Sequence, residues 1–156
     1  MTVLGLETST DVCSVGLIRE QEIRVERSVI ESHIHSEKLL TLVQEVLKQA
    51  GMALADLEGI GVSVGPGSFT GLRIGLSSAK GLAFALDKPL AAVPTFQAIA
   101  SAAFERHPDI HRPGIVLDAK QGDFYTAVFE RTRGGFHETE PVGVRNAEEI
   151  VAMVSA

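Results

Sequence analysis

The sequence of 156 residues predicts an α/β fold in two lobes, and three observations lead to this prediction. Runs with strand periodicity alternate with runs of helical periodicity along most of the chain. A glycine-rich turn at 65–75 lies between a short apolar run and a long helical one, which is a strand–turn–helix arrangement. Two similar hairpins, at 4–17 and 115–129, open what we expect to be separate lobes at residues 1–105 and 106–156.

The composition excludes several classes of protein. An apolar fraction of 45% and a charged fraction of 22% are typical of a soluble globular protein. No apolar run reaches the ~18 residues of a membrane helix, and the start of the chain lacks the basic segment of a signal peptide. We therefore expect a cytoplasmic protein with no membrane partner. The single cysteine, Cys13, excludes an internal disulfide, and the net charge of −6 argues against nucleic-acid binding by this chain alone.

The first expected lobe begins with strands at 2–8, 12–19 and 22–28, whose short connections predict an antiparallel meander. Ser36 is a candidate N-cap for a helix at 37–50, which Gly51 ends. A strand at 59–64 follows, so this helix forms a crossover between parallel strands. The lobe is completed by elements at three further places, a helix at 70–86, a strand at 90–93 and a helix at 95–105.

The second expected lobe follows a polar, proline-bearing segment at 106–113. It contains a strand at 114–118, a turn, a strand at 123–130, a third strand near 135–138 and a short helix at 146–154. In both lobes an apolar strand ends in a carboxylate, Glu7 or Asp118, and a hairpin doubles back. This repetition suggests the duplicated actin-like, sugar-kinase-like ATPase fold, with two lobes that each open with a β-hairpin.

The glycine-rich turn supports two interpretations. A strand, a glycine-rich turn and a helix point backbone N–H groups at a bound anion, which indicates a phosphate-binding loop. The alternative is a tight turn that only packs a helix on a sheet. The candidate residues of a vestigial nucleotide site are Glu7, Ser9, Thr10, Gly65, Gly67 and Asp118. The alternative for Glu7 and Asp118 is that they are only hairpin-turn acids.

Two predicted helices have more apolar surface than one sheet face requires. The helix at 37–50 has a wide apolar arc, and the helix at 70–86 is apolar or small all round, with only Arg73 and Lys80 strongly polar in its middle. The two helices could cover each other in part, but together they favour a surface for a partner helix. The candidate interface residues are Leu39, Leu42, Val43, Val46, Ser77, Lys80, Gly81, Phe84 and Ala85.

Several segments together resemble the TsaB family, also called YeaZ. They are Leu6–Thr10, His35–Leu40, Gly65–Gly75 continuing through Ala83, and Asp118–Tyr125. The resemblance runs through residues 1–130. Members of this family usually have a longer second lobe, so we expect the second lobe of this chain to be incomplete.

The resemblance implies a role in making threonylcarbamoyladenosine beside the anticodon of tRNA. In that pathway TsaD transfers the threonylcarbamoyl group to N6 of adenine, TsaB is its required non-catalytic partner, and the ATPase TsaE joins them. Thr95 and Ile99 stand where TsaD carries its metal-binding histidines, which implies that this chain is not an enzyme. We therefore expect no catalytic residue, metal or cofactor in this chain alone. ATP or ADP and metal are expected in the complex with TsaD, tRNA bound only through the complex, and a homodimer when the chain is alone. The alternative is an independent ATPase or small-molecule kinase of actin-like fold.

Overall fold

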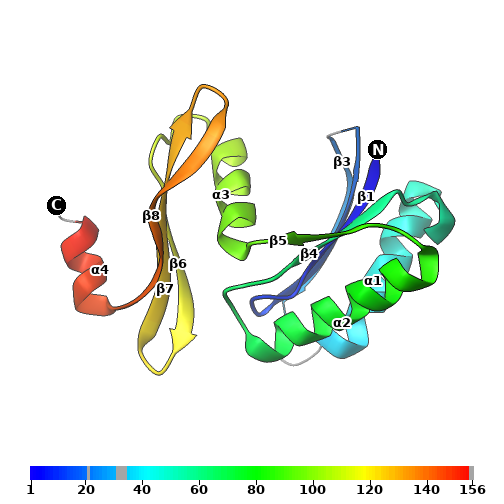
Figure 1. Cartoon of the computed structure of the whole chain (residues 1–156), viewed down its shortest axis with the longest axis horizontal. Coiled ribbons are helices and arrows are strands. Elements are labelled where there is room, and N and C mark those ends of the chain that lie inside the picture. The colour runs from blue at the N-terminus through cyan, green and yellow to red at the C-terminus, as the bar shows by residue number, and fades with distance from the viewer. Residues whose placement is uncertain (21, 31–34, 155–156) are drawn as a thin grey trace. The chain divides into compact units, whose positions relative to one another are not determined.

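The computed structural model describes residues 1–20, 22–30 and 35–154 (Figure 1). The chain divides into two compact units, Met1–Pro94 and Thr95–Ala156. This division lies before the boundary at residue 105 that the sequence suggests, because the helix at 95–106 packs with the second unit. In the part of the chain that is described, no helix is long and apolar enough to span a membrane.

The first unit is built on a five-stranded sheet of order β3-β2-β1-β4-β5. Its strands are β1 (Thr2–Glu7), β2 (Val12–Arg19), β3 (Glu22–Ile30), β4 (Gly59–Ser63) and β5 (Leu90–Val93). The first three form the expected antiparallel meander, and β4 pairs in parallel with both β1 and β5. Leu4 of β1 lies opposite Leu17 of β2 and Ile60 of β4, and all three side chains are buried.

Two long helices cover one face of this sheet, α1 (His35–Ala50) and α2 (Phe69–Leu86), with a short 3₁₀ turn, η1 (Leu54–Asp56), between them in sequence (Figure 1). α1 begins at His35, before the predicted start at Glu37, and the His35 ring Nε2 lies 2.9 Å from the carbonyl oxygen of Thr10. Gly51, at φ +65°, takes the left-handed conformation that ends α1. Asp87 ends α2 in the same way, at φ 53°.

The structure corrects the predicted role of the apolar residues of α1. Leu39, Leu42, Val43 and Val46 were expected on a partner surface, yet all four are buried in the core of the first unit. They pack with side chains of the sheet, such as Leu17 of β2, and with α2 residues such as Ala79 and Ala83. The wide apolar arc of α1 is therefore covered by its own unit.

The second unit contains α3 (Thr95–Arg106), the antiparallel strands β6 (Gly114–Lys120), β7 (Asp123–Thr132) and β8 (Gly135–Asn146), and α4 (Ala147–Val154). Phe96, Ala100 and Phe104 are spaced by one helical turn on α3 and are buried with Phe129 of β7 and Ile115 of β6. β8 is much longer than the strand expected near 135–138. Its pairing with β7 continues across two register irregularities. Because such irregularities interrupt the alternation of apolar and polar residues, the sequence pattern does not indicate the full length of β8.

Candidate functional site

The glycine-rich segment between β4 and α2 packs directly on the turn between β1 and β2. The Ser68 N–H donates to the Ser9 carbonyl at 2.6 Å, and the Thr8 hydroxyl donates to the Gly71 carbonyl at 2.8 Å. A Cβ atom at Gly67 would lie 2.2 Å from the Ser9 carbonyl oxygen, and one at Gly71 would lie 2.0 Å from the Thr8 carbonyl oxygen. These two glycines are therefore required for close packing, which supports the tight-turn interpretation.

The end of β1 carries a small polar network. One carboxylate oxygen of Glu7 accepts from the Ser9 N–H, and the other accepts from the Ser63 hydroxyl at the end of β4. The Ser9 hydroxyl is buried and has no hydrogen-bond partner among the described residues. Buried hydroxyl groups are usually hydrogen-bonded, and a bound group could reach this one only if the turn opened, because Ser9 is 1% exposed.

The start of α2 is already capped by its own side chain. Ser68 is the N-cap, and its hydroxyl accepts from the Gly71 N–H at 3.2 Å. This bond uses one of the free N–H groups that a phosphate-binding helix start would offer. Gly65, at φ +106°, takes a conformation that favours glycine, as the sequence suggests for the turn.

The remaining candidates for the nucleotide site, Thr10 and Asp118, belong to different units. The Thr10 hydroxyl accepts from the Val12 N–H at 3.2 Å and so stabilises the β1–β2 turn. Asp118 belongs to the second unit, where the Lys120 backbone N–H, followed by its side chain, holds the pKa of this carboxyl below its ordinary value. A joint site of Glu7 and Asp118 stays a prediction.

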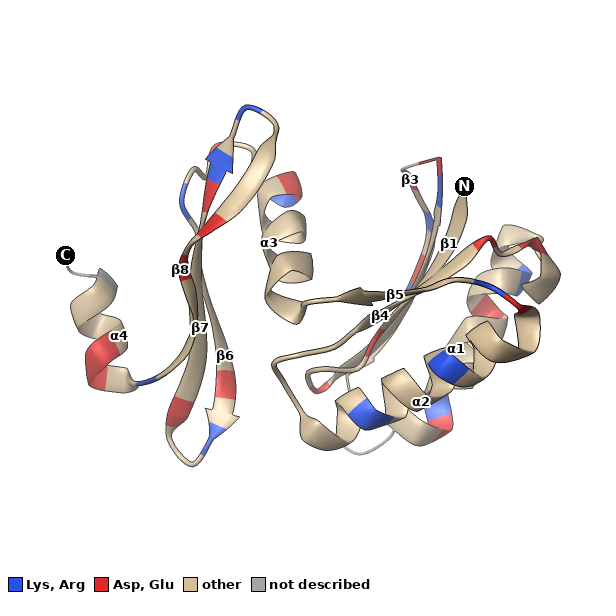
Figure 2. Cartoon of the chain, in the orientation of Figure 1, with Lys and Arg blue, Asp and Glu red and all other residues tan. Residues whose placement is uncertain are grey.

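The outer face of α2 carries the candidate interface residues that the sequence places on this helix. Ser77, Lys80, Gly81, Phe84 and Ala85 are all exposed, and Phe84 is 92% exposed. Outside the helix's own backbone, a Cβ atom at Gly81 would meet no atom of the described residues within 4 Å, so the backbone of this helix is open to a close neighbour. α2 has two basic residues, Arg73 and Lys80, and no acidic one (Figure 2).

Two exposed features of the helices were missed by the sequence analysis. Phe69, at the first turn of α2, is 68% exposed, and the Arg73 guanidinium lies 3.9 Å from the centre of its ring. The i, i+4 spacing of an aromatic residue and an arginine was the available signal for this pair. On α1 the apolar residue Leu40 is 51% exposed. The sequence pattern did not single it out, because it lies among the other apolar residues of the wide arc.

Thr95 and Ile99, which stand where the resemblance places metal ligands in TsaD, take part in packing. The Thr95 side chain is fully buried at the start of α3, and Ile99 packs against the core of the second unit. Across residues 1–20, 22–30 and 35–154, no group of three or more His, Cys, Asp or Glu side chains is placed to hold a metal ion.

Comparison with known proteins gives consistent matches. The family model of TsaD, described as tRNA N6-adenosine threonylcarbamoyltransferase, matches residues 29–147. The chain is 34% identical over 140 residues to the tRNA threonylcarbamoyladenosine biosynthesis protein TsaB of Haemophilus influenzae, covering 88% of this chain and 58% of that protein. The TsaB of Bacillus subtilis is also 34% identical, over 142 residues, with 90% of this chain and 60% of that protein covered.

Solved structures agree with these matches. YeaZ from Pseudomonas aeruginosa has a TM-score of 0.84 at 33% identity, covering 92% of this chain and 66% of that chain. Component A of the (R)-2-hydroxyglutaryl-CoA dehydratase of Acidaminococcus fermentans has a TM-score of 0.53 at 15% identity, covering 94% of this chain and 47% of that chain, a likeness in fold alone. The predicted actin-like, sugar-kinase-like ATPase fold is thus confirmed. The chain spans about three fifths of the length of the curated relatives it matches.

Proposed function

The chain belongs to the TsaB (YeaZ) family, and on this premise we propose that it serves tRNA threonylcarbamoyladenosine biosynthesis as a non-catalytic subunit. In this role it binds TsaD through α2 and activates it. The proposed complex works in the cytoplasm, includes TsaE, and reaches tRNA only through the other subunits. ATP or ADP and metal are bound in the complex, and the chain alone forms a homodimer through the same helix.

The exposed face of α2 is the observation that carries this proposal. An aromatic side chain that is 92% exposed costs free energy in water, and covering it on a partner recovers roughly 2 kcal/mol. Ser77, Gly81 and Ala85 are small, and they let a second helix approach closely along the same stripe. Gly71 and Gly75, on the other side of the helix, lie close against Thr8, so the exposed stripe faces away from the unit's own sheet.

The proposed lack of catalysis rests on the positions that match the metal ligands of TsaD. Thr95 and Ile99 contribute to the packing of α3, and an isoleucine side chain has no donor atom for a metal. The partner would then supply the metal and the transfer chemistry, while this chain supplies a surface.

The alternative, an independent ATPase or kinase, is favoured by one observation. The Ser9 hydroxyl lies beside the Glu7 carboxylate and has no hydrogen-bond partner among the described residues, although it is buried and would have to become accessible before it could contact a nucleotide phosphate. Calorimetry with ATP and Mg²⁺ separates the two functions. Micromolar binding with turnover, both lost in Glu7→Ala, would establish the alternative.

The proposed function is tested by co-purification with TsaD and by a threonylcarbamoyl-transfer assay with and without this chain. We expect transfer only when both proteins are present. Gly81→Arg should abolish co-purification and leave the melting temperature nearly unchanged, because the side chain projects into open space. The matched control is Ile23→Ala, which removes an exposed apolar residue from β3 and should leave co-purification intact. Survival of the complex in Gly81→Arg would refute the role of α2.

A further inference from the structure

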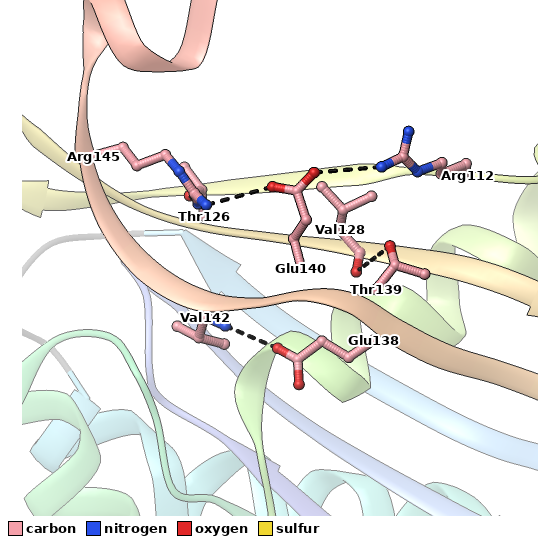
Figure 3. Close-up of polar contacts among 8 residues, drawn as sticks. All are labelled: Arg112, Thr126, Val128, Glu138, Thr139, Glu140, Val142 and Arg145. Atoms are coloured by element: carbon pink, nitrogen blue, oxygen red, sulfur yellow. Dashed lines mark hydrogen bonds and ion pairs between the residues drawn. The ribbon is translucent and has the colours of Figure 1, made fainter. Parts of the chain in front are cut away.

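Two arginine side chains converge on one carboxylate in the second unit (Figure 3). The Arg112 Nη2 lies 3.3 Å from one oxygen of Glu140, and the Arg145 Nη2 lies 3.4 Å from the other. The Arg145 Nη1 also donates to the Thr126 hydroxyl. These side chains come from β7, β8 and the segment before β6, so the strand pairing of the second unit brings them together.

Among the described residues, protein groups engage only part of the donor capacity of these two arginines. Charge-assisted N–H···O bonds are usually about 2.7–2.9 Å long, so both contacts with Glu140 are long. A guanidinium has five N–H donors, and the contacts among described residues occupy one of them in Arg112 and two in Arg145. The cluster carries a net charge of about +1 from two arginines and one glutamate.

A hollow lies directly beside this cluster. It has a volume of about 260 Å³ and is lined by Arg112, Gly114, Val128, Glu140 and Met153. Apart from its chain neighbours, none of the described residues has an atom within 4 Å of the position of a Cβ at Gly114, which leaves this side of the hollow open to them. Arg145 does not line the hollow, but its Nη2 lies 3.4 Å from the carboxylate of Glu140, which does. Its Nη1 donates to the hydroxyl of Thr126, a fully buried residue, which fixes the guanidinium from the strand side.

We propose that Arg112 and Arg145 form a binding site for a small dianionic phosphate, a monoester or a pyrophosphate. Glu140 is the competitor for the two guanidinium groups, and as a tethered group it acts at an effective concentration in the millimolar range or above. A free carboxylate has the same charge and cannot displace it. A phosphate monoester carries about −1.5 to −2 charge and three acceptor oxygens, which suits two converging arginines. A nucleic-acid backbone phosphate has a single charge, and the chain's net charge of −6 repels a long polyanion.

The test is a titration of the full chain with pyrophosphate at constant ionic strength, followed by amide NMR signals. We expect saturable shifts of the Gly114 and Gly143 amides, since Gly143 lies beside the Arg145 guanidinium. Arg112→Gln, at a side chain that is 59% exposed, removes donors without disturbing the core and should weaken binding about tenfold. Arg145→Lys is the second variant, and it keeps the charge but loses the forked donors.

Glu140→Gln provides the opposite expectation. It removes the competing charge and should tighten pyrophosphate binding by at least about threefold, whereas a purely structural ion pair would give no gain. A single-stranded oligonucleotide without terminal phosphates tests whether the site binds the phosphodiester groups of a nucleic acid. We expect it to leave the signals of the Gly114 and Gly143 amides unshifted. The proposal is overturned by an absence of saturable shifts, by unchanged affinity in Arg112→Gln, by unchanged or weaker affinity in Glu140→Gln, or by oligonucleotide binding as tight as that of pyrophosphate.

Discussion

Gly71 and Gly81 lie on the same helix but have opposite surroundings. The position of a Cβ at Gly71 is 2.0 Å from a backbone oxygen, whereas at Gly81 it is open. Gly71→Ala should therefore lower the free energy of unfolding by about 2 kcal/mol or more, because the Thr8 carbonyl belongs to the backbone and cannot move aside cheaply. Urea unfolding of the purified variant measures this change.

Gly81→Ala is the matched control for that prediction. In the middle of an exposed helical face, alanine in place of glycine should raise the free energy of unfolding by up to about 1 kcal/mol. If the two variants had equal stabilities, the close approach of α2 to the β1–β2 turn would be contradicted.

Cys13 makes the folding stability depend on pH in the alkaline range. Burial, with a smaller contribution from the nearby Glu7 charge, raises the pKa of the Cys13 thiol. The folded state therefore keeps this proton to higher pH than the unfolded chain does. The resulting stabilisation is present below the thiol pKa of the unfolded chain and is lost as pH rises through the raised pKa of the folded state. Cys13→Ala should flatten the fall in stability above pH 8.5, which denaturation at several pH values can measure. An equally steep fall in Cys13→Ala would contradict this assignment.

At the scale of the helix, α1 offers a comparison between two leucines. Leu42 is buried in the core of the first unit, and Leu40 is 51% exposed. Leu42→Ala should cost about 3 kcal/mol of unfolding free energy through lost burial and a cavity, while Leu40→Ala should change it by less than about 0.5 kcal/mol. Similar losses from both variants in thermal or urea unfolding would show that α1 is oriented differently.

Periodicity predicted the position of most elements, but it assigned the apolar face of α1 wrongly. The bounds of β2 and β5 match those expected, and α1, α2 and α3 differ by one or two residues at an end. The excess apolar surface of α1 was assigned to a partner because a sequence does not show that strands β2 and β3, together with α2, cover the same helix. On α2 the exposed residues coincide with those expected, since small residues and one large aromatic residue at helical spacing mark a face that the core does not use.

The residues of the polar sites were predictable in part. Glu7 ends a short apolar strand and Ser9 follows it, so their location at the end of β1 could be expected from the sequence. The Arg112–Glu140–Arg145 cluster could not be predicted in this way. Glu140 and Arg145 are five residues apart on β8, but Arg112 lies 28 residues before Glu140 and reaches it only through the pairing of β6 with β7 and of β7 with β8. The tight glycine contacts with Thr8 and Ser9 likewise depend on how α2 approaches the β1–β2 turn.

At the scale of the whole molecule, each unit has a core of its own. Among the described residues, the buried cluster of the first unit contains residues before Leu90, and that of the second unit contains residues after Thr95. Phe96, Ala100 and Phe104 predict a buried face on α3, but the spacing does not say which sheet covers it. For this reason the boundary between the lobes predicted from the sequence lies after α3, whereas the two compact units divide before it.

A fragment of residues 1–94 should fold and bind TsaD. It contains the complete five-stranded sheet, both covering helices and the whole exposed face of α2, and it ends where the first compact unit ends. All of the glycine contacts that hold α2 on the β1–β2 turn lie within it. We expect cooperative urea unfolding of the fragment and co-purification with TsaD that Gly81→Arg abolishes. A fragment that folds but fails to bind would move the partner surface to the second unit, and a fragment that does not unfold cooperatively would contradict the independence of the first core.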